Sequence, residues 1–192
     1  MKILSVLTLS LLSSVAMSSE YFVEARTGVS DEYSKKVQNS VSGKLEGDFK
    51  GTNFGLRAGK YIDKHSIHLE YNPSQEVEVK SANEAADVES IFLGYRYNFD
   101  NGIYTGAQVG KQSFELKKGP NGVTFPDNPK ASGITYGVNV GYKYKFTDIY
   151  YVGADFSYNF GSYKDEGPSS TSVTSIEIES SQQLNLVIGI AF

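Results

Sequence analysis

The fold of this chain is decided by its last nine residues, LNLVIGIAF, at positions 184–192. Side chains of a β-strand alternate between two faces, so one face of this segment is entirely apolar and the other is small or mildly polar. The apolar face ends on an aromatic residue and consists of Leu184, Leu186, Ile188, Ile190 and Phe192. Chain ends usually fray unless a sheet holds them. The terminal strand therefore indicates a closed sheet whose outer face lies in lipid.

The same alternation recurs upstream of the terminal strand. It is clearest at 134–146, where aromatic and β-branched residues alternate with Thr, Gly, Asn and Lys without interruption. We predict eight antiparallel strands, at about 21–29, 52–61, 67–72, 90–99, 103–114, 134–146, 150–160 and 184–192. Most are long enough to cross a bilayer when tilted. The predicted fold class is therefore all-β, an eight-stranded up-and-down transmembrane β-barrel.

The connections between the predicted strands alternate between long and short. Short turns are expected at 62–65, at 147–148 and at Asp100-Asn101-Gly102, a strong hairpin signal. Long polar loops are expected at about 30–51, 73–87, 117–132 and 161–175. Pro73 has no backbone N–H and is expected to end the third strand. An even number of strands then returns both termini to the side of the short turns.

These features together resemble the OmpA-like small outer-membrane β-barrels, also grouped as porin-family or opacity-like proteins. The resemblance covers nearly all of residues 19–192 and rests on the architecture and the terminal strand. It implies the outer membrane of a Gram-negative cell, with long extracellular loops and both termini in the periplasm. It also implies that the barrel-assembly machinery reads the terminal strand as an assembly signal. The further partners it implies are outer-membrane lipid and lipopolysaccharide, and host, phage or cell-surface ligands at the loops.

The N-terminal segment has the composition of a targeting signal. Lys2 precedes an apolar, Ser-interrupted stretch at 3–15, and Ala16-Met17-Ser18 offers small residues where a signal peptidase cuts. We predict a cleaved signal peptide at 1–18, with cleavage after Ala16 as the alternative. Residues 19–192 then form one barrel domain, without a periplasmic peptidoglycan-binding domain.

Composition permits a barrel and disfavours several other classes. The chain of 192 residues is 40% hydrophobic with a mean hydropathy of −0.31, unlike a helical membrane protein. Only alternate residues of a barrel strand meet lipid, so such a value is compatible with a transmembrane barrel. The absence of Cys excludes a disulfide framework or a thiolate metal site. A net charge of −4 disfavours nucleic-acid binding.

Charged residues also fall on the faces of the strands that point into the predicted lumen. These inward charges are Glu24, Arg26, Arg57, Glu70, Arg96, Lys143 and Asp155. Four of them lie at similar depth on consecutive strands with alternating sign: Glu24, Arg57, Glu70 and Arg96. We therefore expect a layer of ion pairs. One interpretation is structural filling, because an eight-stranded barrel is just wide enough for side chains to fill it. The other is a gate or a narrow ion path.

Aromatic residues should collect where strands cross the two membrane interfaces. Those that occur at the ends of the predicted strands form a candidate aromatic girdle: Tyr21, Tyr97, Phe99, Tyr144, Phe146, Tyr150, Tyr158 and Phe160.

We predict no enzyme, metal site or cofactor. Barrel enzymes such as lipid A deacylases, palmitoyltransferases and omptin proteases have their sites towards the outer leaflet or the surface. Hydrolases usually need a His base near a nucleophile. The two histidines, His65 and His68, fall at the turn end and lack a His-x-Ser pair.

Three functions remain open at this stage. The first is an integral outer-membrane protein with a structural or surface-interaction role through long extracellular loops. The second is a narrow porin-like channel for small solutes or ions. The third, an extracytoplasmic lipocalin-like binding barrel, is disfavoured by the terminal Phe192 and by the asymmetry of the loops.

Overall fold

Antiparallel strands make up almost all of the part of the chain that the structure describes. This computed structural model describes residues 21–39, 43–79, 83–119, 124, 128, 130–165 and 173–192. The strands are β1 (Tyr21–Asn39), β2 (Gly43–Gly51), β3 (Phe54–Ile62), β4 (His65–Val79), β5 (Glu84–Asn98), β6 (Ile103–Lys118), β7 (Lys130–Lys145), β8 (Tyr150–Asp165) and β9 (Val173–Ala191). Within these ranges, no helix is long and apolar enough to cross a membrane. The predicted signal peptide lies outside the described residues.

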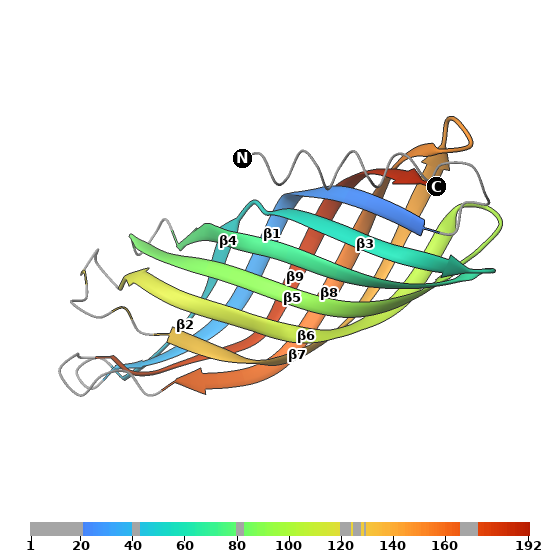
Figure 1. The fold of residues 1–192 in the computed structure, drawn as a ribbon. Coiled ribbons are helices and arrows are strands. Elements are labelled where there is room, and N and C mark those ends of the chain that lie inside the picture. The colour runs from blue at the N-terminus through green and yellow to red at the C-terminus, as the bar shows by residue number, and fades with distance from the viewer. Residues whose placement is uncertain are drawn as a thin grey trace, which may run out of the picture.

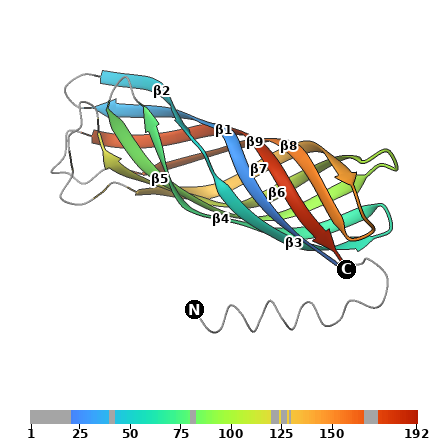
Figure 2. The same ribbon diagram turned by 90° about the horizontal axis from the view of Figure 1, so that it is seen from above.

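The sheet closes on itself between its first and last strands (Figures 1 and 2). β1 pairs with β3 on one side and with β9 on the other, in register from Phe22↔Ala191 to Gly28↔Asn185. Tyr21 and Phe192 complete the seam with two backbone hydrogen bonds of 2.8 Å. β2 and β3 follow each other along one position of the wall, with a break at 52–53. The prediction of an eight-stranded antiparallel barrel is therefore confirmed.

Alternation along the strands produces the expected polarity in the half of the barrel that holds the short turns. In β7 the six outward apolar side chains from Ile134 to Tyr144 are 48% to 62% exposed. Thr135 and Asn139, between them, are buried in the lumen. A lipocalin has the opposite arrangement, with an apolar interior. The outward apolar face lies where hydrocarbon replaces water as the surrounding solvent.

Three of the four segments predicted as long loops, 30–51, 73–87 and 161–175, are more than half strand, so that prediction was wrong there. In the fourth, 117–132, the described strand residues are 117–118 and 130–132. β1 continues to Asn39, β4 to Val79, β6 to Lys118 and β8 to Asp165. The reason is an inversion of polarity along the same strands. Past the apolar outer belt, Val77 faces the lumen while Glu76 and Glu78 are exposed. A sequence that alternates in this way carries no net apolar signal, yet its period is still that of a strand.

β4 also continues through Pro73, which was expected to end it. The strand bulges there, and its register with β5 shifts between Asn72 and Gln75. The missing ladder with β3 is replaced by the Gln75 side chain. Its amide nitrogen donates to the Phe54 carbonyl at 2.6 Å, and its oxygen accepts from the Phe54 N–H at 2.6 Å. A β-bulge that aims a side chain at the freed backbone thus accommodates the proline.

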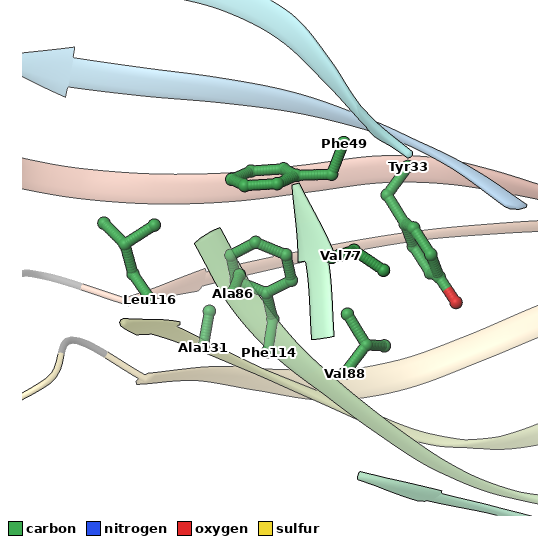
Figure 3. Packing of buried hydrophobic residues seen from close by; sticks show 8 residues of the cluster. All are labelled: Tyr33, Phe49, Val77, Ala86, Val88, Phe114, Leu116 and Ala131. Carbon is green, nitrogen blue, oxygen red and sulfur yellow. The ribbon is translucent and has the colours of Figure 1, made fainter. Parts of the chain in front are cut away.

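An apolar cluster fills the end of the barrel opposite the short turns, which we call the outer end (Figure 3). Its buried members are Tyr33, Phe49, Val77, Ala86, Val88, Phe114, Leu116 and Ala131. The rings of Phe49 and Phe114 pack edge to face at 5.0 Å. This cluster stabilises the strand extensions as a soluble protein core does, because their outer faces are polar.

Candidate functional site

Seven charged side chains meet in the lumen, in the half of the barrel that holds the short turns. β1, β3, β4, β5, β7 and β8 supply them, and they are the residues singled out in the sequence: Glu24, Arg26, Arg57, Glu70, Arg96, Lys143 and Asp155. We call this set the charged layer. Six of the seven side chains have no solvent exposure, and Lys143 has 8%. The three arginines are the largest fully buried side chains among the described residues.

Arg57 lies at the centre of the charged layer. Its Nε and Nη2 donate to Glu70 Oε2 at 2.9 Å and 2.5 Å. Its Nη1 donates to Glu24 Oε2 at 2.7 Å and to Asp155 Oδ2 at 3.2 Å. A guanidinium presents several donors in a fixed plane, and here one arginine bridges all three carboxylates.

The other arginines close the layer on either side of Arg57. Arg26 donates to Asp155 Oδ1 at 2.8 Å and also pairs with Glu70. Arg96 donates from Nη1 to both oxygens of Glu24 at 3.1 Å. Each carboxylate therefore contacts at least two guanidinium groups. Such pairing is required, since an isolated buried charge costs several kcal/mol.

Four aromatic rings lie between the charged layer and the turn end of the barrel, and we call them the aromatic cage: Phe22, Tyr61, Tyr104 and Tyr151. They enclose the ammonium group of Lys143. The alternation of the predicted strands puts Phe22, Tyr104 and Tyr151 on inward faces, but no role was predicted for them. The sequence feature that could have singled them out is an aromatic residue on an inward face whose other residues are mostly small or polar.

Amide and hydroxyl side chains fill the lumen on the other side of the charged layer. Gln108 donates to Asn159 at 2.7 Å, Asn159 to Ser181 at 3.3 Å, and Gln183 to the Tyr33 hydroxyl at 3.2 Å. Tyr33 already belongs to the apolar cluster of the outer end. Side chains therefore fill the lumen from the aromatic cage to the outer end.

A cavity of about 650 Å³ lies at the turn end of the barrel. Tyr61, Lys143 and Ala191 line it on the lumen side, and the turns around Lys64 and Asn101 form its rim. A second cavity, of only about 10 Å³, lies beside Asn53 and Gln75 behind the bulge in β4. The first cavity is therefore a vestibule that ends at the aromatic cage.

The two histidines lie in different surroundings. His68 is buried in the lumen beside Phe22, whereas His65 is exposed and its Nδ1 lies 2.5 Å from the Tyr95 hydroxyl. In the described ranges, no three His, Asp or Glu side chains are placed to hold a metal ion.

The predicted girdle residues lie on the outward face, most of them exposed: Tyr21, Tyr97, Phe99, Tyr144, Phe146, Tyr150, Tyr158 and Phe160. The terminal strand has the predicted face too. Leu184, Leu186 and Ile188 are 44% to 63% exposed, and Ile190 is half-buried. The Phe192 ring stacks on Tyr21 at 6.4 Å.

An acidic residue organises the surface of the outer end. Glu115 accepts hydrogen bonds from Lys117 and Asn128 at 2.8 Å, and its other oxygen pairs with Lys130 at 2.9 Å. Hydrogen bonds from Lys117, Lys130 and Asn128 lower the pKa of Glu115 from its ordinary value of 4.5 to about 2.

A closed barrel with an apolar outer belt and a polar, filled lumen defines a small integral membrane β-barrel protein. The chain belongs to the family described as outer membrane protein beta-barrel domain, whose sequence profile matches residues 4–190. The protein is therefore a β-barrel of the Gram-negative outer membrane. A search of curated proteins found no significant match.

Outer-membrane proteins are among the solved structures that this chain resembles. Ail of Yersinia pestis, in complex with the heparin analogue sucrose octasulfate, is 11% identical with a TM-score of 0.48, covering 88% of this chain and 99% of Ail. OprG from Pseudomonas aeruginosa is 12% identical with a TM-score of 0.48, covering 88% of this chain and 95% of OprG. At such identities the likeness concerns the fold alone.

One similar structure corrects the sequence analysis. The outer membrane protease OmpT from Escherichia coli is 9% identical with a TM-score of 0.42, covering 93% of this chain and 100% of OmpT. The prediction that this chain is not an enzyme does not hold against this comparison, because a protease is among the similar structures. The likeness assigns no activity to this chain.

Proposed function

We propose that this protein has a structural or surface-interaction role in the outer membrane and that its lumen is closed to ions and small solutes. The observation that carries the proposal is the charged layer, whose ion-paired residues fill the lumen. Arg26, Arg57 and Arg96 are all at most 1% exposed. A conducting path needs solvated charges, whereas these charges satisfy one another.

The outer end supports the surface-interaction part of the proposal. Its strands continue past the apolar belt, pack around the apolar cluster and expose residues such as Lys50, Glu76 and Lys130. This arrangement provides a folded, polar surface at the end of the barrel opposite the short turns. We propose host, phage or cell-surface molecules as ligands of the loops at this end, and lipopolysaccharide as the surrounding lipid.

The proposal also includes topology and biogenesis. The short turns and both termini face the periplasm, in keeping with the usual arrangement of bacterial barrels. The assembly machinery recognises the terminal strand, and the girdle residues lie at the two membrane interfaces.

Reconstitution into planar bilayers tests the closed lumen against the channel alternative. Wild-type protein should give no steady conductance, while its folded state in the same preparation is verified by the heat-dependent gel shift of folded barrels. Insertion of silent wild-type protein is verified separately, by the same gel shift on barrel recovered from vesicles of the bilayer lipid. Steady wild-type conductance would establish the channel instead.

A further inference from the structure

The ammonium group of Lys143 is surrounded by aromatic faces. Its Nζ lies 4.9 Å from the ring centroid of Tyr104, 5.1 Å from those of Phe22 and Tyr151, and 5.4 Å from that of Tyr61. All four distances fall within the roughly 6 Å range of cation–π attraction. Several rings around one cation is the arrangement with which proteins bind free ammonium ligands.

Lys143 donates one hydrogen bond to the cage, from Nζ to the Tyr61 hydroxyl at 3.1 Å, and each ring also has a contact that does not involve Lys143. The Tyr104 hydroxyl donates to Asp155 at 3.0 Å, and the Tyr151 hydroxyl donates to Glu24 at 3.0 Å. Phe22 and Tyr61 pack against each other with centroids 4.8 Å apart. The aromatic cage is therefore organised in advance, and the lysine occupies it.

Two glycines make room for the tyrosines of the cage. A Cβ on Gly141 would lie 2.3 Å from Cζ of Tyr104, and one on Gly189 would lie 2.3 Å from Cζ of Tyr151. Each ring thus rests directly on a glycine backbone of the barrel wall. This close approach restricts the rings further, whether or not a cation is bound.

Lys143 is also the charged residue that the layer can most easily release. Without it, three arginines face three carboxylates. Its partner Glu24, at 3.0 Å from Nζ, keeps Arg57 and Arg96 as partners when Lys143 moves away. Lys143 alone in the layer has side-chain exposure and lines the vestibule.

From these observations we propose that the aromatic cage is an ammonium-binding site open to the periplasmic vestibule, with Lys143 as its tethered occupant. Its ligand class is small alkylammonium ions, which compete with the lysine for the same four rings. Glu24 supplies the carboxylate for the incoming cation. An anionic or neutral ligand would gain nothing from the rings or from Glu24.

The first test uses refolded barrel in detergent and n-butylammonium chloride as the probe. Lys143→Ala empties the cage, so its thermal unfolding midpoint should rise with butylammonium, in proportion to the logarithm of its concentration once the site is occupied. Wild-type protein should need at least about tenfold more butylammonium for the same rise in midpoint, because the lysine occupies the site most of the time. 1-Butanol, which has the same chain without the charge, should not raise the unfolding midpoint.

Two variants control for the site. Lys143→Met fills the cage with an uncharged stem. Butylammonium chloride should raise its unfolding midpoint no more than sodium chloride does. Adding Phe22→Leu to Lys143→Ala removes one ring that makes no hydrogen bond, and it should weaken the response. If Lys143→Ala responds to butylammonium no better than Lys143→Met does, the proposal is wrong.

A second measurement needs no substitution and remains decisive if Lys143→Ala does not fold. Wild-type protein is acetylated with an amine-reactive ester in tetramethylammonium chloride or in sodium chloride at equal concentration, and labelling is read by peptide mass spectrometry. Tetramethylammonium should displace Lys143 from the cage and raise its labelling several-fold. Labelling of exposed Lys145, on the same strand, should be equal in both salts. Equal labelling of Lys143 in the two salts would overturn the proposal.

Discussion

Arg57 illustrates how burial sets the energetic weight of a residue. It pairs with Glu24, Glu70 and Asp155 and is 1% exposed. Replacement of Arg57 by Ala leaves three carboxylates short of a partner. Removing one member of a buried ion pair typically costs about 3 to 5 kcal/mol.

We therefore expect Arg57→Ala to unfold at clearly lower urea concentration than wild type when refolded barrels are titrated. Lys64→Ala is the control, because the Lys64–Asp100 pair of 2.7 Å is exposed at a turn and such pairs contribute about 0 to 1 kcal/mol. If the two variants unfold at the same concentration, the ion pairs of Arg57 contribute no more than a surface pair.

Glu115 gives a residue-scale prediction about pH. Its pKa falls from 4.5 to about 2 on folding, so its ionised form stabilises the fold at every pH above about 4.5. This contribution is lost progressively as pH falls from about 4.5 to about 2. Glu115→Gln should therefore be less stable than wild type at pH 6, and the difference should shrink towards pH 2. A difference in unfolding midpoint that is constant over this range would contradict the prediction.

At the scale of the elements, the membrane-spanning parts of the strands could be predicted because lipid outside and polar groups inside impose one clear alternation. The outer strand extensions could not, since Val77, Glu76 and their neighbours invert the alternation at the membrane boundary. The continuation of β4 through Pro73 could not be predicted for a different reason. The rule that proline ends a strand is local, whereas the Gln75 side chain replaces the lost hydrogen bonds by contacting Phe54 on another strand.

The charged layer likewise has one part that could be predicted from the sequence and one part that could not. Parity along each strand is local, so the inward direction of Arg57 and Glu70 could be predicted from the sequence. The contact between Arg26 on β1 and Asp155 on β8 could not, because it depends on the stagger of strands around the closed barrel. The aromatic cage combines rings from four strands and was missed for this reason.

Phe192, which directly follows β9, gives a prediction about assembly of the barrel. Its loss removes ring stacking on Tyr21 and two backbone hydrogen bonds, and burial of one aromatic ring contributes about 1.5 to 3 kcal/mol. Because we propose that the terminal strand is also read during assembly, deletion of Phe192 should lower the yield of folded barrel more than it lowers the stability of barrel refolded in detergent.

The yield is measured in outer-membrane fractions by the heat-dependent gel shift. Leu184→Asp, on the same outward face, should also lower it, whereas Lys118→Ala, exposed at the outer end, should not. A wild-type yield for the deletion would show that the terminal residue is incidental to assembly.

For the whole molecule, the two ends of the barrel differ in solvent and in chemistry. The turn end holds the short connections and the start of the seam at Tyr21 and Phe192 (Figure 1), and the vestibule opens there. The other end has the apolar cluster under a polar surface (Figure 3). An extension with its own apolar core is stable in water, so we propose that it faces the cell exterior. Asn101 at a turn and Glu76 on the extension of β4 are exposed at opposite ends.

The orientation can be measured with single cysteines, because the chain has no native Cys. A membrane-impermeant maleimide added to intact cells should label the Glu76→Cys variant and leave the Asn101→Cys variant unlabelled. Both should react after the outer membrane is permeabilised, which controls for the reactivity of each site. Labelling of Asn101→Cys in intact cells, with Glu76→Cys protected, would place the vestibule at the cell surface. The alkylammonium ions that we propose for the aromatic cage would then come from outside the cell instead of from the periplasm.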